Sequence, residues 1–96
     1  MRQVHSFRVE ADHPALEGHF PGRPIVPGVV LLDEALAAIE AVCGLTPPLR
    51  LARIKFTAPV LPGETVAVLL DEPRDGRVSF ACASGERRVL SGIVQA

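Results

Sequence analysis

The sequence contains no tryptophan and no tyrosine, and its aromatic residues are four phenylalanines among 96 residues. Proteins that bind single-stranded nucleic acid stack bases on aromatic rings and carry a surplus of positive charge. Here ten basic and eleven acidic residues are interspersed and give a net charge of -1, so no basic stripe forms. We therefore expect no nucleic-acid partner.

Cysteine is also scarce, and Cys43 and Cys82 belong to no CxxC or zinc-type motif. We expect free buried thiols in a reducing compartment. Residues 1–13 mix charged and apolar side chains and lack a signal-peptide core, and the long apolar segment further on is too short and too acidic to span a bilayer. We therefore expect a cytoplasmic protein without membrane insertion.

The chain is short yet 48% hydrophobic. A length of 96 residues corresponds to one domain, and a domain of this size leaves much apolar surface near the outside. We therefore expect a single domain over residues 1–96. A partner subunit should cover part of its surface, in a homodimer or a dimer of dimers.

Hydrophobic periodicity predicts a first strand over residues 4–11 and a helix over residues 28–43, with Gly44 at the position where a glycine ends a helix. Because this helix is apolar nearly all round, we expect it to be buried nearly all round. Alternation of Ala52, Ile54, Phe56 and Ala58 with Arg53, Lys55 and Thr57 predicts a second strand.

Turn signals then predict three further strands over residues 65–70, 78–83 and 88–94, so that the last four strands form a meander. One apolar helix and about five antiparallel strands pack most simply when the sheet curls round the helix. The expected fold class is therefore α+β.

Residues 19–28 read HFPGRPIVPG and lead directly into the predicted helix. Three prolines and two glycines between Pro21 and Gly28 favour a loop that is rigid without being regular. This loop would hold His19 ahead of the helix start, where free backbone N–H groups point outward, and Asp33 lies one turn inside. These are the parts of an acid/base site that acts beside a polarised carbonyl.

The run HFPGRPIVPG at 19–28, followed by VVLLDEA at 29–35, resembles the signature of the hot-dog-fold (3R)-3-hydroxyacyl-[acyl-carrier-protein] dehydratases. The block IKFTAPVLPGET at 54–65 resembles a second block of that family, and the two follow each other in the family's order. The resemblance implies a hot-dog fold and elimination of water from a 3-hydroxyacyl thioester, giving a trans-2-enoyl thioester in fatty acid or related acyl or polyene biosynthesis. It also implies acyl carrier protein as a partner. The substrate would be carried on its phosphopantetheine, with no cofactor bound by the enzyme.

By the same resemblance, the catalytic histidine falls on His19, the catalytic acid falls on Asp33, and the backbone N–H that binds the thioester carbonyl belongs to Gly28. The residues beside these that we expect to contact the substrate are Phe20, Pro27 and Val29. The family pairs the histidine of one chain with the carboxylate of the other. Because Asp33 must be protonated to act as an acid, it needs a dry apolar setting, which helical spacing would draw from Val29, Val30, Leu36 and Ala37.

Other interpretations remain open. His19 could be a hydrogen-bonded loop histidine, and Asp33 could be a carboxylate favoured by the helix dipole. Glu40, on the same helix face as Asp33, is a second candidate for the catalytic acid. Glu34 is expected in solvent or at a dimer edge. The spacing of the three histidines suits no metal site. The basic side chains of the strands, at Arg50, Arg53, Lys55, Arg87 and Arg88, are expected on exposed strand faces, with docking of an acidic carrier protein as the alternative.

Two alternative functions also stay open. A hot-dog acyl thioesterase would use a carboxylate to activate water and would need no histidine. A non-catalytic acyl-binding subunit, or the partner subunit of a heterodimer, would need neither group. The chain is shorter than typical family members at its N-terminus and at residues 44–49, which favours the second alternative, whereas intact His19 and Asp33 disfavour it.

Overall fold

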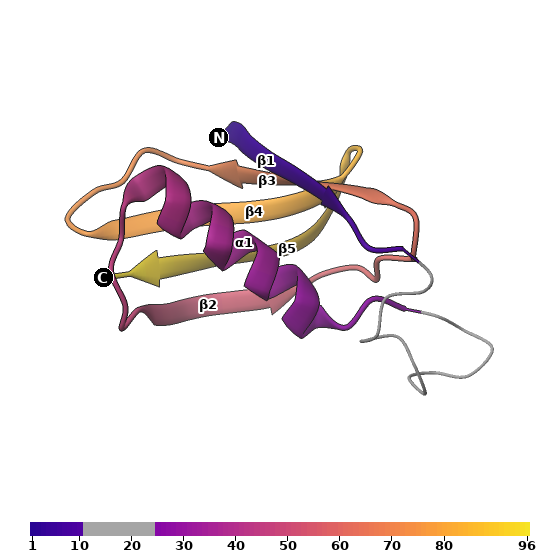
Figure 1. The fold of residues 1–96 in the computed structure, drawn as a ribbon, viewed down its shortest axis with the longest axis horizontal. Coiled ribbons are helices and arrows are strands. Elements are labelled where there is room, and N and C mark those ends of the chain that lie inside the picture. Colours follow the sequence, from indigo (N-terminus) through magenta and orange to yellow (C-terminus); the bar gives the residue numbers. More distant parts are fainter. Residues whose placement is uncertain (11–24) are drawn as a thin grey trace.

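The computed structural model describes residues 1–10 and 25–96. Their elements are, in chain order, β1 (Arg2–Arg8), α1 (Gly28–Cys43), β2 (Arg50–Phe56), β3 (Thr65–Leu70), β4 (Arg77–Ser84) and β5 (Arg87–Gln95). The five strands form one sheet in the order β1-β3-β4-β5-β2, in which all neighbours are antiparallel. The helix α1 lies across one face of this sheet (Figure 1). This is the α+β arrangement expected from the sequence.

The order of the strands corrects the predicted four-stranded meander. Hairpins join β3 to β4 and β4 to β5, but β2 pairs with β5 and lies at the edge of the sheet, far from β3. The chain between β2 and β3 therefore crosses to the opposite side of the sheet. Turn signals mark where strands end, but they do not say which strands pair. A Pro-Gly sequence such as Pro62-Gly63 occurs both in hairpins and in crossover connections.

The predicted alternation of β2 is interrupted by a bulge. Arg53 has a φ of 55°, and the register against β5 shifts between Ala52 and Lys55. Ala52 and Lys55 oppose residues of β5 that are two positions apart, so they share a face. The expectation that Ala52 shares a face with Phe56 is therefore wrong, because the extra residue in the bulge reverses the alternation.

The ends of α1 fall where the sequence predicted. Gly44 adopts the left-handed conformation with a φ of 67° and donates its N–H to the carbonyl of Glu40. The buried side chains of α1 recur every three or four residues and face the sheet; they are Leu31, Ala35, Ala38 and Ile39. The opposite side is exposed, and Val29 is 62% exposed. The expectation that the helix is buried nearly all round is thus wrong for one chain, since one sheet covers one side of it.

The core fills the space between α1 and the sheet. Phe80 and Ile39 are among its largest buried side chains, and each apolar side chain of this size contributes roughly 1.5–3 kcal/mol to folding. Both cysteines are free thiols: Cys82 is buried and Cys43 is half-buried. Burial raises the pKa of the Cys82 thiol to about 12. Within the described residues, no helix is long and apolar enough to cross a membrane.

Gly92 of β5 lies close to side chains of both neighbouring strands, Ile54 on β2 and Phe80 on β4. A Cβ at this position would overlap Cδ1 of Ile54 and lie 3.0 Å from Cε1 of Phe80. We therefore expect Gly92→Ala to lower the free energy of unfolding by about 1–3 kcal/mol in urea denaturation. Because Ile54→Val removes Cδ1, the double variant should recover part of this loss. A Gly92→Ala protein as stable as the parent would show that the strands are not packed this closely.

Candidate active site

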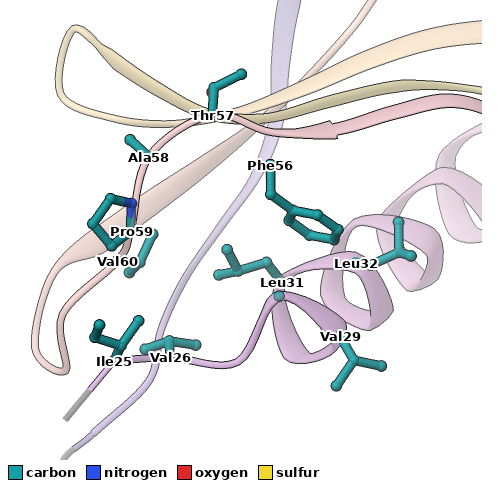
Figure 2. A pocket seen from close by; sticks show the side chains of 11 residues that line it. Ile25, Val26, Val29, Leu31, Leu32, Phe56, Thr57, Ala58, Pro59 and Val60 are labelled. Carbon is teal, nitrogen blue, oxygen red and sulfur yellow. The ribbon is translucent and has the colours of Figure 1, made fainter. Parts of the chain in front are cut away.

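An apolar pocket of about 720 Å³ opens where α1 begins (Figure 2). One wall of it is lined by residues before and in the first turns of α1, namely Ile25, Val26, Gly28, Val29, Leu31 and Leu32. Phe56, the last residue of β2, and residues 57–60 after it line the other wall. Thr57 supplies the polar side chain of this lining, and its Oγ1 donates a hydrogen bond to the carbonyl of Arg88. An apolar pocket with few polar groups is suited to an acyl chain or a similar ligand.

The N-terminus of α1 lies at this pocket. Pro27 is the N-cap residue, Gly28 lines the pocket, and among the described residues no side chain caps the helix start. The first N–H groups of a helix have no partner inside the helix, and they lie at the positive end of its dipole. The arrangement can therefore hold a carbonyl oxygen, and it can stabilise negative charge that develops on that oxygen.

The ring of Phe56 lies against Gly28. A Cβ on Gly28 would come within 2.7 Å of Cε1 and 2.9 Å of Cδ1 of that ring. Phe56 is itself 52% exposed and points from β2 toward the helix start (Figure 2). Glycine at this position thus allows the edge strand to approach the first turn of α1 closely.

A backbone hydrogen bond fixes the chain just ahead of the helix. The N–H of Val26 donates to the carbonyl of Val60 at 2.8 Å, and both side chains are buried. Val26 precedes the helix start by two residues, and Val60 belongs to the opposite wall of the pocket. This bond therefore sets the distance between the two walls.

The structure brings only part of the predicted site together. Gly28 and Val29 line the pocket, and Pro27 caps the helix beside it. His19 and Phe20 lie outside the described residues. Phe56 was not among the site residues predicted from the sequence, although the family-like block at 54–65 contains it and could have indicated it.

Asp33 does not line the pocket. At 3.6 residues per turn, five residues separate it from Gly28 by about 140° round the helix. It lines a separate, smaller depression of about 250 Å³ with Val30, Glu34 and Ala37, and it is exposed. The dry setting expected for Asp33 is therefore not formed by one chain, because this side of α1 does not face the sheet.

Glu34 and Glu40, the two other carboxylates of α1, also lie outside the pocket lining. An Oε2 of Glu34 lies 3.5 Å from Nε2 of His5 on β1, and both side chains are 43% exposed. Glu40 is exposed. Among residues 1–10 and 25–96, no group of His, Cys, Asp and Glu side chains could hold a metal ion.

Comparison with known proteins identifies the family. Residues 2–93 match the profile of the ApeI-like family, described as ApeI dehydratase. The chain belongs to the ApeI-like dehydratase family. It is 39% identical over 85 residues to the 3-hydroxyacyl-[acyl-carrier-protein] dehydratase FabZ of Herpetosiphon aurantiacus, which covers 77% of this chain and 60% of the relative. FabZ of Chloroflexus aggregans is 38% identical over 87 residues, covering 79% and 60%.

This ApeI-like chain thus spans about 60% of the length of these curated relatives. Among solved structures, it superposes on a chain of the dehydratase heterocomplex ApeI:P from Xenorhabdus doucetiae with a TM-score of 0.77 at 18% identity, covering 97% of this chain and 94% of that one. A fluoroacetyl-CoA-specific thioesterase, FlK, superposes with a TM-score of 0.59 at 21% identity, covering 94% and 85%. The ApeI-like chain therefore has the hot-dog fold, which dehydratases and thioesterases share.

The contact between Gly28 and Phe56 gives a direct test of the pocket geometry. Gly28→Ala should displace the ring of Phe56 and lower the free energy of unfolding by about 1–3 kcal/mol. The double variant Gly28→Ala/Phe56→Leu, which replaces the ring with a smaller side chain, should recover part of the loss. Urea denaturation of both variants and of Phe56→Leu alone checks this, and equal stability of Gly28→Ala and parent would contradict the contact.

Proposed function

We propose that this ApeI-like chain acts as a hydro-lyase that converts a 3-hydroxyacyl thioester on acyl carrier protein into the trans-2-enoyl thioester. The observation that carries the proposal is the helix N-terminus at Gly28, which opens onto an apolar pocket. Gly28 follows the last residue of the HFPG motif, Gly22, by six positions in the sequence. The family match over residues 2–93 and relatives named 3-hydroxyacyl-[acyl-carrier-protein] dehydratases support the same reaction.

In this reaction the backbone N–H of Gly28 donates a hydrogen bond to the thioester carbonyl oxygen, and the apolar pocket holds the acyl chain. Withdrawal of charge onto the carbonyl oxygen makes the C2 proton more acidic. A fixed hydrogen-bond donor of this kind is worth on the order of 2.7–4 kcal/mol at the transition state, because it needs no reorganisation as charge develops. The apolar lining excludes water and strengthens the interaction further.

His19 takes the proton from C2, and the electron pair of that bond forms the C2–C3 double bond. The bond from C3 to its oxygen breaks, and Asp33 gives the leaving hydroxyl a proton so that it departs as water. The enzyme is left with His19 protonated and Asp33 ionised, and proton exchange with solvent restores both. Each such proton transfer contributes on the order of 10²–10⁴ to the rate.

The position of Asp33 supports a site that is built from residues of two subunits. It lies about 140° round the helix from Gly28, beside exposed Val29 and Ala37. A second subunit packed on this face would cover Asp33 and could bring it to the pocket of its partner. We therefore propose a homodimer, or a dimer of dimers, in a cytoplasmic enzyme. A heterodimer with another hot-dog subunit is the alternative, supported by the heterocomplex that contains the structural relative from Xenorhabdus doucetiae.

Single substitutions test the assigned roles. His19→Ala should lower the rate of enoyl thioester formation from 3-hydroxyacyl-acyl carrier protein at least about 10²-fold, because the base is lost. Asp33→Asn keeps the shape of the side chain but cannot deliver a proton, so it should lose a similar factor. Glu34→Gln is the matched control on the next residue and should stay within a few-fold of the parent.

The same reactions distinguish the alternatives, since enoyl formation and thiol release can be followed separately. Release of free thiol without enoyl product by the parent would identify a thioesterase. Binding of 3-hydroxyacyl-acyl carrier protein without formation of either product would identify a non-catalytic subunit. A His19→Ala variant that retains nearly full dehydration would overturn the mechanism.

A further inference from the structure

One carboxylate joins the segment after β2 to the β4–β5 hairpin. Oε2 of Glu64 accepts a hydrogen bond of 2.7 Å from the N–H of Leu61. Its Oε1 accepts hydrogen bonds from Nη2 of Arg87 at 2.6 Å and from Oγ of Ser84 at 3.2 Å. Ser84 and Arg87 pair across the hairpin. Arg87 is exposed at the start of β5, as expected from the sequence, and its side chain, which is 49% exposed, also forms this ion pair.

The same contacts reach the wall of the pocket. Nη2 of Arg87 also donates to the carbonyl of Pro59 at 3.3 Å. Pro59 and Leu61 therefore both have backbone groups held by this network, and Val60 lies between them. The carbonyl of Val60 accepts the N–H of Val26, two residues ahead of Gly28.

We propose that Glu64 is a positioning residue for the pocket: through Arg87 and Leu61 it fixes the Val60 carbonyl, and through Val26 it fixes the start of α1. The assignment of that helix start as the site of the thioester carbonyl rests on the proposed function. Glu64 touches no substrate in this account. It acts through the backbone, by holding two walls of the pocket at one separation.

The ionised form of Glu64 is stabilised by its hydrogen-bond partners. The hydrogen bond from the Leu61 N–H, followed by the hydrogen bond from Arg87, lowers the pKa of Glu64 below its ordinary value. Among the described residues, Arg87 on β5 is the charged side chain paired with this carboxylate. Because the pKa is lower in the folded state, the stabilisation is present at neutral pH and is lost as the pH falls through the folded-state pKa.

Amide hydrogen exchange at Val26 tests the positioning role without reference to activity. Glu64→Gln removes the charge and one of the acceptors, so Val60 should move more freely and the Val26 N–H should exchange at least about tenfold faster. Amides of the β3–β4 ladder should keep the exchange rates of the parent. The matched control is Glu86→Gln, which makes the same charge change at an exposed position of the same hairpin and should leave Val26 unchanged.

Arg87→Gln provides a second variant, with Arg88→Gln as its neighbouring control. It should speed exchange at Val26 by a smaller factor, since the Leu61 bond to Glu64 remains. Arg87 helps to keep the pKa of Glu64 low. In Arg87→Gln, the protection of the Val26 amide against exchange should therefore begin to fall at a higher pH on acidification than it does in the parent.

The outcomes separate the two proposals. Unchanged exchange at Val26 in both Glu64→Gln and Arg87→Gln overturns the positioning role, and so does equal acceleration of all core amides, which would mean general destabilisation. If Glu64→Gln does not fold, the comparison of Arg87→Gln with Arg88→Gln decides. Failure of the parent to form enoyl thioester would overturn the proposed function and leave the exchange result standing.

Discussion

The start of α1 is held against the edge of the sheet, and the rest of the site depends on this attachment. The ring of Phe56 lies on Gly28, and the N–H of Val26 donates to the carbonyl of Val60 at 2.8 Å. Together these contacts place the positive end of the helix dipole at an apolar pocket. In such surroundings the dipole interacts more strongly with a carbonyl oxygen than it does in water. They add to the burial of Leu31 against the sheet in fixing the first turn of α1 relative to the opposite wall.

The packing of α1 also determines which of its side chains face away from the sheet. Once Leu31 and Ile39 are buried against the sheet, the helical period leaves Asp33 on the exposed side with Val29. One chain therefore presents a helix start that is suited to a carbonyl oxygen in one place and a carboxylate in another. We propose that the two meet only when a second subunit packs on the exposed side of α1. This side of the helix would then be used both for assembly of the subunits and for catalysis.

The sequence predicted the features that local physics decides. The apolar period located α1, and glycine at position 44 ended it in the left-handed conformation that glycine adopts readily. It did not predict that β2 pairs with β5, because pairing depends on contacts distant in the chain. The bulge at Arg53 and the ion pair between Glu64 and Arg87 were missed for the same reason. The resemblance of residues 19–28 to a family motif led to the prediction of a site at Gly28, and the structure has an apolar pocket at that residue. The exposure of Asp33 followed only from the packing of α1.

Complementation between two inactive variants tests most directly whether each site draws on two chains. His19→Ala chains and Asp33→Asn chains are mixed in equal amounts, subunit exchange is demonstrated with differently tagged chains, and enoyl thioester formation is measured. A mixed dimer would carry one intact site and one doubly damaged site, so random exchange should restore about a quarter of the parent rate. Demonstrated exchange with no recovery of activity would contradict the shared site.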